Sequence, residues 1–421
     1  MEKTMKLGYR LTEDWTVVLL GGLLIAIALM GISVPSPVFA WKNTAELAEK
    51  VLTMGNLGQI GLLFAYVYAL ALLASWVLGN SLTSMAQGFP IVYGLTILAL
   101  MLAGNAFLKN WNLEAVIISL SLGLLLSNFF QLPSWLLASL STELFVKIGL
   151  VLLGTSVIFG DILKAGTLGL IQALIVVISV WYFAFWVCKK MGVDEEMAIM
   201  ISSGVSICGV SAAIATSGAI KGDPKKLSYV ISIVLITAIP MIIFLPLLAQ
   251  FLGLSQEVTG AWLGGTIDTT GAVIASGSLV GETALKISTI VKFSQNVLLG
   301  LAAFAISIYW TYRKKEGADV SDMKPTAGVI WERFPKFVLG FIAASLLFSF
   351  VVPSETLDSV KGPLKSLQGL WFALAFTSIG LETKFADLFK QEGRKPLYAF
   401  LIAQAFNVVL TLGIAYVLFA S

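Results

Sequence analysis

The sequence contains no histidine among its 421 residues. This absence excludes catalytic triads that use histidine as the base and metal sites built from imidazole ligands. The only two cysteines, Cys188 and Cys208, both lie in apolar stretches, so nothing predicts a disulfide framework or a metal cluster. We therefore expect no catalytic residues, no metal site and no organic cofactor, and we do not expect an enzyme.

Charge is also scarce. Only 12% of the residues are charged and 58% are hydrophobic, whereas soluble domains carry roughly twice this share of charge. Apolar runs of about 20 residues recur from end to end, which predicts an all-α polytopic membrane protein. We expect a multi-pass protein of the inner (plasma) membrane, with the lipid bilayer as its surroundings and no nucleic-acid partner.

Thirteen apolar segments are candidates for spanning the membrane. The first follows a polar start and resembles a signal peptide, but its apolar core is too long for a typical signal, so we expect it to remain as a helix. The candidate segments lie at residues 15–34, 57–79, 89–108, 113–130, 143–160, 166–189, 195–220, 226–252, 258–280, 284–312, 333–353, 366–383 and 394–419.

The one long connection is rich in charge and carries two prolines, which is typical of a cytoplasmic linker. Four parts are expected along the chain. These are N-terminal extra transmembrane helices at 1–112, a first repeat with core transport segments at 113–312, the linker at 313–336, and the C-terminal helices of a second repeat at 337–421.

Two apolar segments, Gly204–Gly218 and Gly264–Ser278, are rich in small and polar residues. Their sequences resemble each other, so we call them the copied segments. Irregular or polar backbone at membrane depth is tolerated only inside protein or along a cavity. Paired, glycine-interrupted segments are the sequence pattern of a transporter's binding site. We expect two broken or re-entrant core segments and 11–13 transmembrane segments in all. The distribution of Lys and Arg mildly favours re-entrant hairpins, and broken helices remain nearly as good an interpretation.

A second internal similarity links Gly154–Lys164 with Gly380–Lys390. Each copy closes one apolar segment and precedes another. An odd number of crossings separates the copies, so they have opposite orientations in the membrane. This pattern predicts the inverted-topology repeat of a secondary transporter.

Five motifs in order make the chain resemble the YeiH-type family, whose members are proposed sulfate exporters. The likeness covers roughly residues 113–419 and leaves about three extra N-terminal helices outside it. The motifs lie at Gly149–Leu163, Ser206–Ala212, Gly260–Gly264, Val291–Ser294 and Gly380–Leu388.

The resemblance implies a transporter fold, but two positions depart from the family pattern. The chain has Asp268 and Thr269 where the family usually has His-Glu, and Gln295 where the family usually has Arg. A carboxylate and a guanidinium are thus altered together. The substrate therefore does not follow from the resemblance.

The candidate substrate-binding residues lie in and after the two copied segments. A helix broken at glycine leaves free N–H groups that attract anions, although close packing through small residues explains the same pattern. Lys292 is expected to offset an anionic substrate or pair with Asp268, or else to extend to an interface, as Lys147 is expected to do. The candidates are Ser206, Cys208, Gly209, Ser211, Thr266, Thr269, Thr270, Lys292, Gln295 and Asn296.

Asp268 is the candidate ion-coupling residue. A carboxylate at membrane depth is costly unless it is paired or protonated, so it is expected to be functional. It would carry a coupling proton or join oxygens around Na⁺. The alternative is a helix cap near the interface.

We expect a secondary active transporter, an exporter of a small anion such as sulfate, sulfite, a sulfonate or a carboxylate. It would move a core domain against a scaffold and form a homodimer. The alternative is an H⁺- or Na⁺-coupled carrier of a neutral or zwitterionic small solute. An intramembrane enzyme or a channel is a third reading, for which the sequence offers neither a nucleophile–base pair nor a filter repeat.

Overall fold

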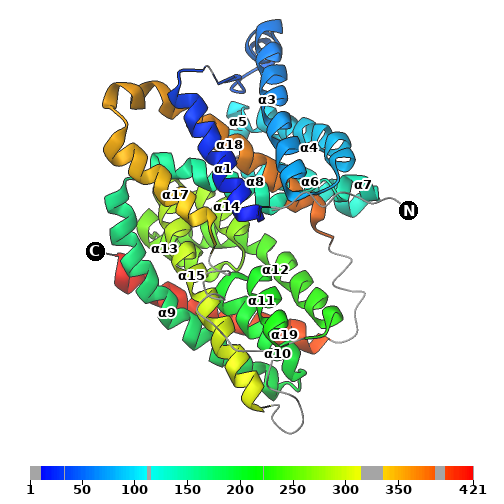
Figure 1. Ribbon diagram of the computed structural model, residues 1–421, viewed down its shortest axis with the longest axis vertical. Coiled ribbons are helices and arrows are strands. Elements are labelled where there is room, and N and C mark those ends of the chain that lie inside the picture. The colour runs from blue at the N-terminus through cyan, green and yellow to red at the C-terminus, as the bar shows by residue number, and fades with distance from the viewer. Residues whose placement is uncertain are drawn as a thin grey trace. The chain divides into compact units, whose positions relative to one another are not determined.

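A computed structural model describes residues 11–32, 34–110, 115–220, 222–313, 335–384 and 394–420. Over these ranges the chain is almost entirely helical (Figure 1), and the expected all-α architecture is confirmed there. The one isolated β-bridge within them pairs Trp41 with Asn105. The expected linker lies outside the described residues apart from its ends, and so do residues 385–390 of the copy Gly380–Lys390.

The helices form two compact units, each built from two stretches of sequence. Unit 1 comprises Met1–Phe159 and Lys336–Lys384, and unit 2 comprises Gly160–Pro335 and Phe385–Ser421. The four-part division expected along the sequence stays a prediction. The C-terminal region of the chain contributes helices to each of the two units.

In unit 1 the C-terminal stretch packs among the N-terminal helices: α18 lies against α4, α6 and α8, and α17 lies against α1 and α8. The helices of unit 1 are α1 (Glu13–Leu29), α2 (Thr44–Glu46), α3 (Met54–Leu78), α4 (Leu82–Ala103), α5 (Ala106–Asn110), α6 (Ala115–Phe129), α7 (Ser134–Leu137), α8 (Thr142–Leu153), α17 (Phe337–Leu346) and α18 (Ser354–Glu382).

A cluster of charges ties the start of α1 to α8 in unit 1. The Lys147 ammonium lies 2.6 Å from Glu13 Oε1, 3.1 Å from Asp14 Oδ1 and 3.8 Å from Glu143 Oε2. Asp14 also accepts a hydrogen bond from the Lys336 backbone N–H at the start of α17 (2.8 Å). Lys147 is therefore paired with three carboxylates, and its expected extension to an interface stays a prediction.

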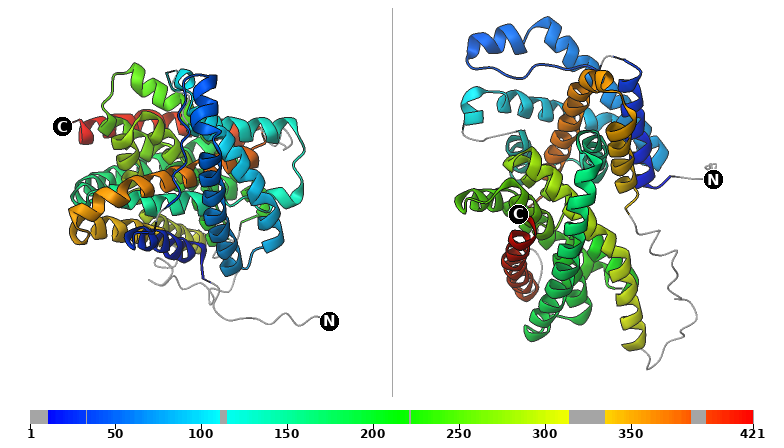
Figure 2. Two further views of the ribbon diagram at one scale, coloured as in Figure 1. Left: turned by 90° about the horizontal axis from the view of Figure 1, so that it is seen from above. Right: turned by 90° about the vertical axis from the view of Figure 1, so that its left-hand side faces the viewer.

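In unit 2 two interrupted segments lie among long helices (Figures 1 and 2). The segment α10–α11 packs against α12, and α13 packs against both α15 and α19. The helices of unit 2 are α9 (Phe159–Lys190), α10 (Glu195–Ser203), α11 (Val210–Ile220), α12 (Pro224–Phe251), α13 (Gln256–Thr266), α14 (Thr270–Val280), α15 (Glu282–Arg313) and α19 (Arg394–Phe419).

Side-chain caps fix where several of these helices begin. The Asp194 carboxylate accepts from the Met197 N–H at the start of α10, and the Ser255 hydroxyl accepts from the Val258 N–H at the start of α13 (both 3.3 Å). Such caps satisfy N–H groups that have no partner within the helix. The starts of both interrupted segments are thus set by local sequence.

Six helical stretches among the described residues are long and apolar enough to cross a membrane. Others fall short in length or carry more charge, including the four short helices of the interrupted segments. The expected number of 11–13 transmembrane segments remains a prediction. The six stretches are Met54–Leu78, Leu82–Ala103, Ser134–Ser156, Phe159–Lys190, Lys225–Phe251 and Arg394–Phe419.

Candidate functional site

The first interrupted segment breaks at Gly209. After α10 the chain makes a π-helical turn, Gly204–Cys208, and α11 begins again at Val210. Gly209 has φ 61° and ψ −111°, a backbone conformation that residues other than glycine rarely adopt. The glycine in this copy is therefore what allows the chain to turn between two half-helices.

The second interrupted segment breaks at Ile267–Thr269. Ile267, which follows α13, is extended at φ −75° and ψ 133°. Thr269 then caps α14, its hydroxyl accepting a hydrogen bond from the Ala272 N–H (3.3 Å). Both breaks lie where the copied sequence predicts irregular backbone, and the choice between re-entrant and spanning segments stays a prediction.

The two breaks lie against each other. A Cβ placed on Gly209 would be 3.1 Å from Asp268 Cβ and 3.3 Å from Thr269 Cγ2. It would also be 2.7 Å from a methyl group of Val234 on α12. Only a residue without a side chain fits here, so the copied segments meet at their irregular centres.

Lys292 on α15 joins the two breaks. Its ammonium donates hydrogen bonds to the Ile207 carbonyl (2.7 Å), to the Ile267 carbonyl (2.8 Å) and to the Gln295 side-chain oxygen (2.9 Å). The side chain is only 1% exposed. The alternative in which Lys292 extends to an interface is therefore wrong, because its charge is held in the interior by backbone carbonyls.

Two amide side chains donate hydrogen bonds to the backbone carbonyls that precede Ile207 and Ile267. Gln295 lies on α15, and Asn407 lies on α19; both are buried. Since the last carbonyls of a helix have no partner within it, these amides satisfy acceptors at the ends of both half-helices. Gln295 Nε2 donates to the Ser206 and Gly265 carbonyls (2.7 and 3.3 Å), and Asn407 Nδ2 donates to the Val205 and Thr266 carbonyls (both 3.2 Å).

The reading of the sequence missed the residues of α19 and one on α9. Gln404 donates to the Thr266 carbonyl (2.9 Å), Thr411 donates to the Asn407 side-chain oxygen (2.8 Å), and Gln172 donates to the Ala261 carbonyl (2.7 Å). On α19 the three polar residues Gln404, Asn407 and Thr411 recur at i, i+3 and i+7, which places them on one face of an otherwise apolar helix. This spacing is the feature of the sequence that could have indicated their role.

Asp268 lies within the second break, and no hydrogen bond from the described residues reaches its carboxylate. The residue is 1% exposed, and neither carboxylate oxygen has a hydrogen-bond partner among the described residues. The capping role belongs to its neighbour Thr269, so the alternative of Asp268 as a helix cap is not what the structure shows. A buried carboxylate in this state is typical of a site that takes up a proton or a ligand.

The remaining candidates are brought together only in part. Asn296 donates to the Thr270 hydroxyl (3.3 Å), and its own side-chain oxygen has no partner within the described ranges. The buried Ser206 hydroxyl donates to the Ser202 carbonyl within its own helix (2.7 Å). Ser211 is exposed on α11. The polar groups of Thr266 and Cys208 are buried near the breaks.

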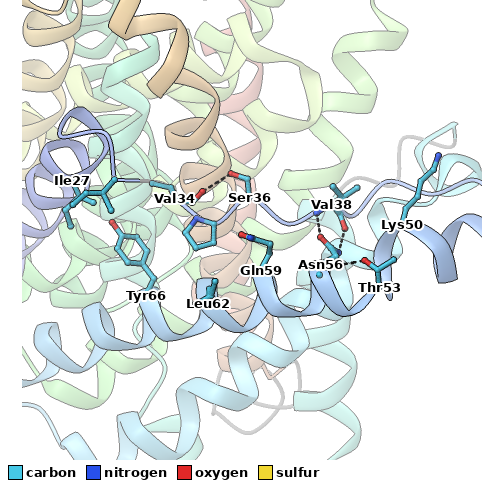
Figure 3. A pocket seen from close by; sticks show the side chains of 13 residues that line it. Ile27, Val34, Ser36, Val38, Lys50, Thr53, Asn56, Gln59, Leu62 and Tyr66 are labelled. Atoms are coloured by element: carbon cyan, nitrogen blue, oxygen red, sulfur yellow. Dashed lines mark hydrogen bonds between the residues drawn. The ribbon is translucent and has the colours of Figure 1, made fainter.

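An open groove of about 1080 Å³ lies elsewhere, within unit 1, between the end of α1 and α3 (Figure 3). The Asn56 side chain there accepts from the Val38 N–H (2.7 Å) and donates to the Val38 and Val51 carbonyls (2.9 and 2.8 Å). Its polar groups therefore hold the loop before α3, and the groove shows no converging charge like that of the two breaks.

The long apolar helices define this chain as a multi-pass membrane protein. Residues 87–400 match the family described as Conserved hypothetical protein 698, and the chain belongs to that family. The match begins within α4, earlier than the residue 113 expected from the motifs. The sulfate-exporter label carried by the resemblance is no part of this finding.

Several curated relatives are named only as UPF0324 membrane proteins. One from Rhodopirellula baltica is 38% identical over 85% of this chain and 67% of its own length. One from Nitratidesulfovibrio vulgaris is 36% identical over 90% of this chain and 65% of its own length. One from Nitrosomonas europaea is 29% identical over 90% of both chains. The chain spans about two thirds of the length of the first two relatives. No solved structure matches it.

Proposed function

We propose that this protein is a secondary active transporter of a small anion such as sulfate, sulfite, a sulfonate or a carboxylate. The observation that carries the proposal is the meeting of two interrupted helices around a buried Asp268 and Lys292. Interrupted helices at membrane depth are the usual place for a carrier's substrate and coupling ion. The family membership is compatible with this role and names no substrate.

An approximate twofold relation between the breaks supports an inverted arrangement. The two segments align with a constant offset, so Val205 corresponds to Gly265 and Ser206 to Thr266. Gln295 donates to the Ser206 and Gly265 carbonyls. Asn407 donates to the carbonyls at the corresponding positions of the other segment, Thr266 and Val205. Exchanging the two segments therefore exchanges the two amides. Inverted repeats place substrate sites on such an axis.

In the proposal the anion binds at the N-terminal ends of α11 and α14. These ends carry the positive pole of each helix and N–H groups without partners in the helix. Thr270 begins α14, and the Asn296 side chain on α15 donates to its hydroxyl (3.3 Å), so the amide NH₂ of Asn296 lies beside this helix end. Asp268 would repel an anion while ionised, so the proposal assigns it the coupling proton.

A second candidate is a cation-coupled carrier of a neutral or zwitterionic solute. One observation favours it: the three N–H groups of the Lys292 ammonium are all engaged by oxygens. No N–H of Lys292 is then left for an anion. Asp268 would in that case hold H⁺ or Na⁺, or the amino group of a zwitterion.

Transport in proteoliposomes tests the function. Vesicles with purified protein would be preloaded in turn with sulfate, sulfite, a dicarboxylate or the zwitterion taurine and assayed for exchange of the labelled compound. The proposal expects saturable exchange of at least one anion, faster than in empty vesicles. Exchange of neutral or zwitterionic solutes alone would favour the second candidate. No exchange of any solute would contradict both.

A further inference from the structure

The buried ammonium of Lys292 lies where two negative helix ends converge. The half-helix ending at Cys208 and the half-helix ending at Thr266 both present their last carbonyls to α15. Each helix end is equivalent to roughly half a negative charge. Together the two ends amount to about one negative charge, which one ammonium offsets.

The oxygens around this ammonium form the kind of cage that holds an alkali cation. Two are backbone carbonyls at equivalent positions of the copied segments, Ile207 and Ile267, and the third belongs to the Gln295 side chain. Carbonyl and amide oxygens at broken helix ends coordinate Na⁺ in other carriers. A Na⁺ ion and the Lys292 Nζ atom therefore compete for the same oxygens.

We propose that the Lys292 ammonium permanently occupies the position that a coupling Na⁺ would take, so that the site binds no alkali cation. The titratable groups that act electrostatically on Lys292 are Asp268 and Cys208. The consequence for coupling rests on the proposed transport function: the exchangeable charge is then a proton on Asp268. The assignment of Lys292 itself rests only on its contacts and burial.

The test is thermal unfolding of the purified full chain in detergent, in sodium, potassium or choline chloride at equal ionic strength. The wild-type unfolding temperature should be the same in all three salts. The variant Lys292→Ala should unfold several degrees lower in choline and recover part of that loss in Na⁺ or K⁺. Asn407→Ala is the matched control, because it removes a neighbouring donor to the Val205 and Thr266 carbonyls and leaves the ammonium and its three oxygens in place. It should lose stability equally in every salt.

Two results would overturn the inference. One is stabilisation of the wild type by Na⁺ or K⁺ over choline. The other is a loss of stability in Lys292→Ala that no alkali cation reduces. Should that variant not fold, equilibrium binding of radioactive Na⁺ to the wild type decides, since saturable binding contradicts the proposal and its absence supports it. None of these measurements needs a transported solute, so a failed exchange assay remains a separate outcome.

Discussion

Asp268 and Lys292 lie at opposite poles of the interrupted helices. Lys292 contacts carbonyls at two C-terminal ends, and Asp268 precedes Thr269, which caps the N-terminal end of α14. Each charge is thus next to the helix pole of opposite sign, an arrangement worth about 0.3–1 kcal/mol per charge at an exposed site and up to ~2 kcal/mol when partly buried. The pair can therefore coexist in the interior with Asp268 still open to a proton.

Gly209 provides the residue-scale prediction. Gly209→Ala forces a Cβ into a sparsely populated backbone region, which costs about 1–3 kcal/mol, and it crowds Val234 at 2.7 Å, which adds about 1–3 kcal/mol. Gly218→Ala is the control, since nothing lies within 4 Å of its Cβ position inside α11. Denaturant unfolding should show a clear loss of stability for Gly209→Ala and a gain of about 0.5–1 kcal/mol for Gly218→Ala. Equal effects of the two changes would contradict the close approach of the breaks.

Sequence reasoning identified Asp268 and Lys292 because charged residues are rare in apolar segments. It did not assign Lys292 to backbone carbonyls, since the ends of the two half-helices come together only in the folded chain. Gln404 and Asn407 were missed for a related reason. An amide in an apolar helix is common in helix packing, and their partners at Val205 and Thr266 lie far away in the sequence.

At the scale of elements, the copied segments predicted where the helices break. Glycine and small polar residues interrupt both copies at matching positions, so local sequence was sufficient. The contribution of α19 was not predictable from a local pattern. It supplies Gln404 and Asn407 to α13 and to the first break from the far end of the chain.

The prediction at this scale concerns the polar face of α19. Asn407→Leu removes the donor to the Val205 and Thr266 carbonyls. The Thr266 carbonyl keeps the bond from Gln404, whereas the buried Val205 carbonyl and the Thr411 hydroxyl lose their Asn407 partner. Such a loss costs about 1–3 kcal/mol. Val409→Ala on the same helix, at a side chain 72% exposed, should change stability little. Unfolding measured in parallel should separate the two, and an unchanged Asn407→Leu would contradict the role given to α19.

At the scale of the molecule, each unit is assembled from segments distant in sequence. Unit 1 takes α17 and α18 from the C-terminal third of the chain, and unit 2 takes α19. A division at loops and linkers cannot reveal such a partition, because it depends on which apolar faces pack together. We propose that transport moves unit 2, which holds both breaks, relative to unit 1 as scaffold.

The proposed motion leads to a prediction about assembly. A scaffold has to stay fixed while the core moves, and pairing of two scaffolds in the bilayer achieves this. We therefore propose a homodimer. Native mass spectrometry from mild detergent should give a mass of two chains, and dilution should not convert it to monomers at once. Monomers at all concentrations would contradict the dimer and leave the site unaffected.

Transport by an Asp268→Asn variant in proteoliposomes tests the central claim most directly. Asparagine keeps the size of the side chain and removes its titratable proton. The account predicts that wild-type protein accumulates the substrate anion when a pH gradient is imposed. The variant should still exchange labelled for unlabelled substrate, and should lose accumulation driven by the gradient. An Asp268→Asn protein that accumulates substrate as the wild type does would contradict the account.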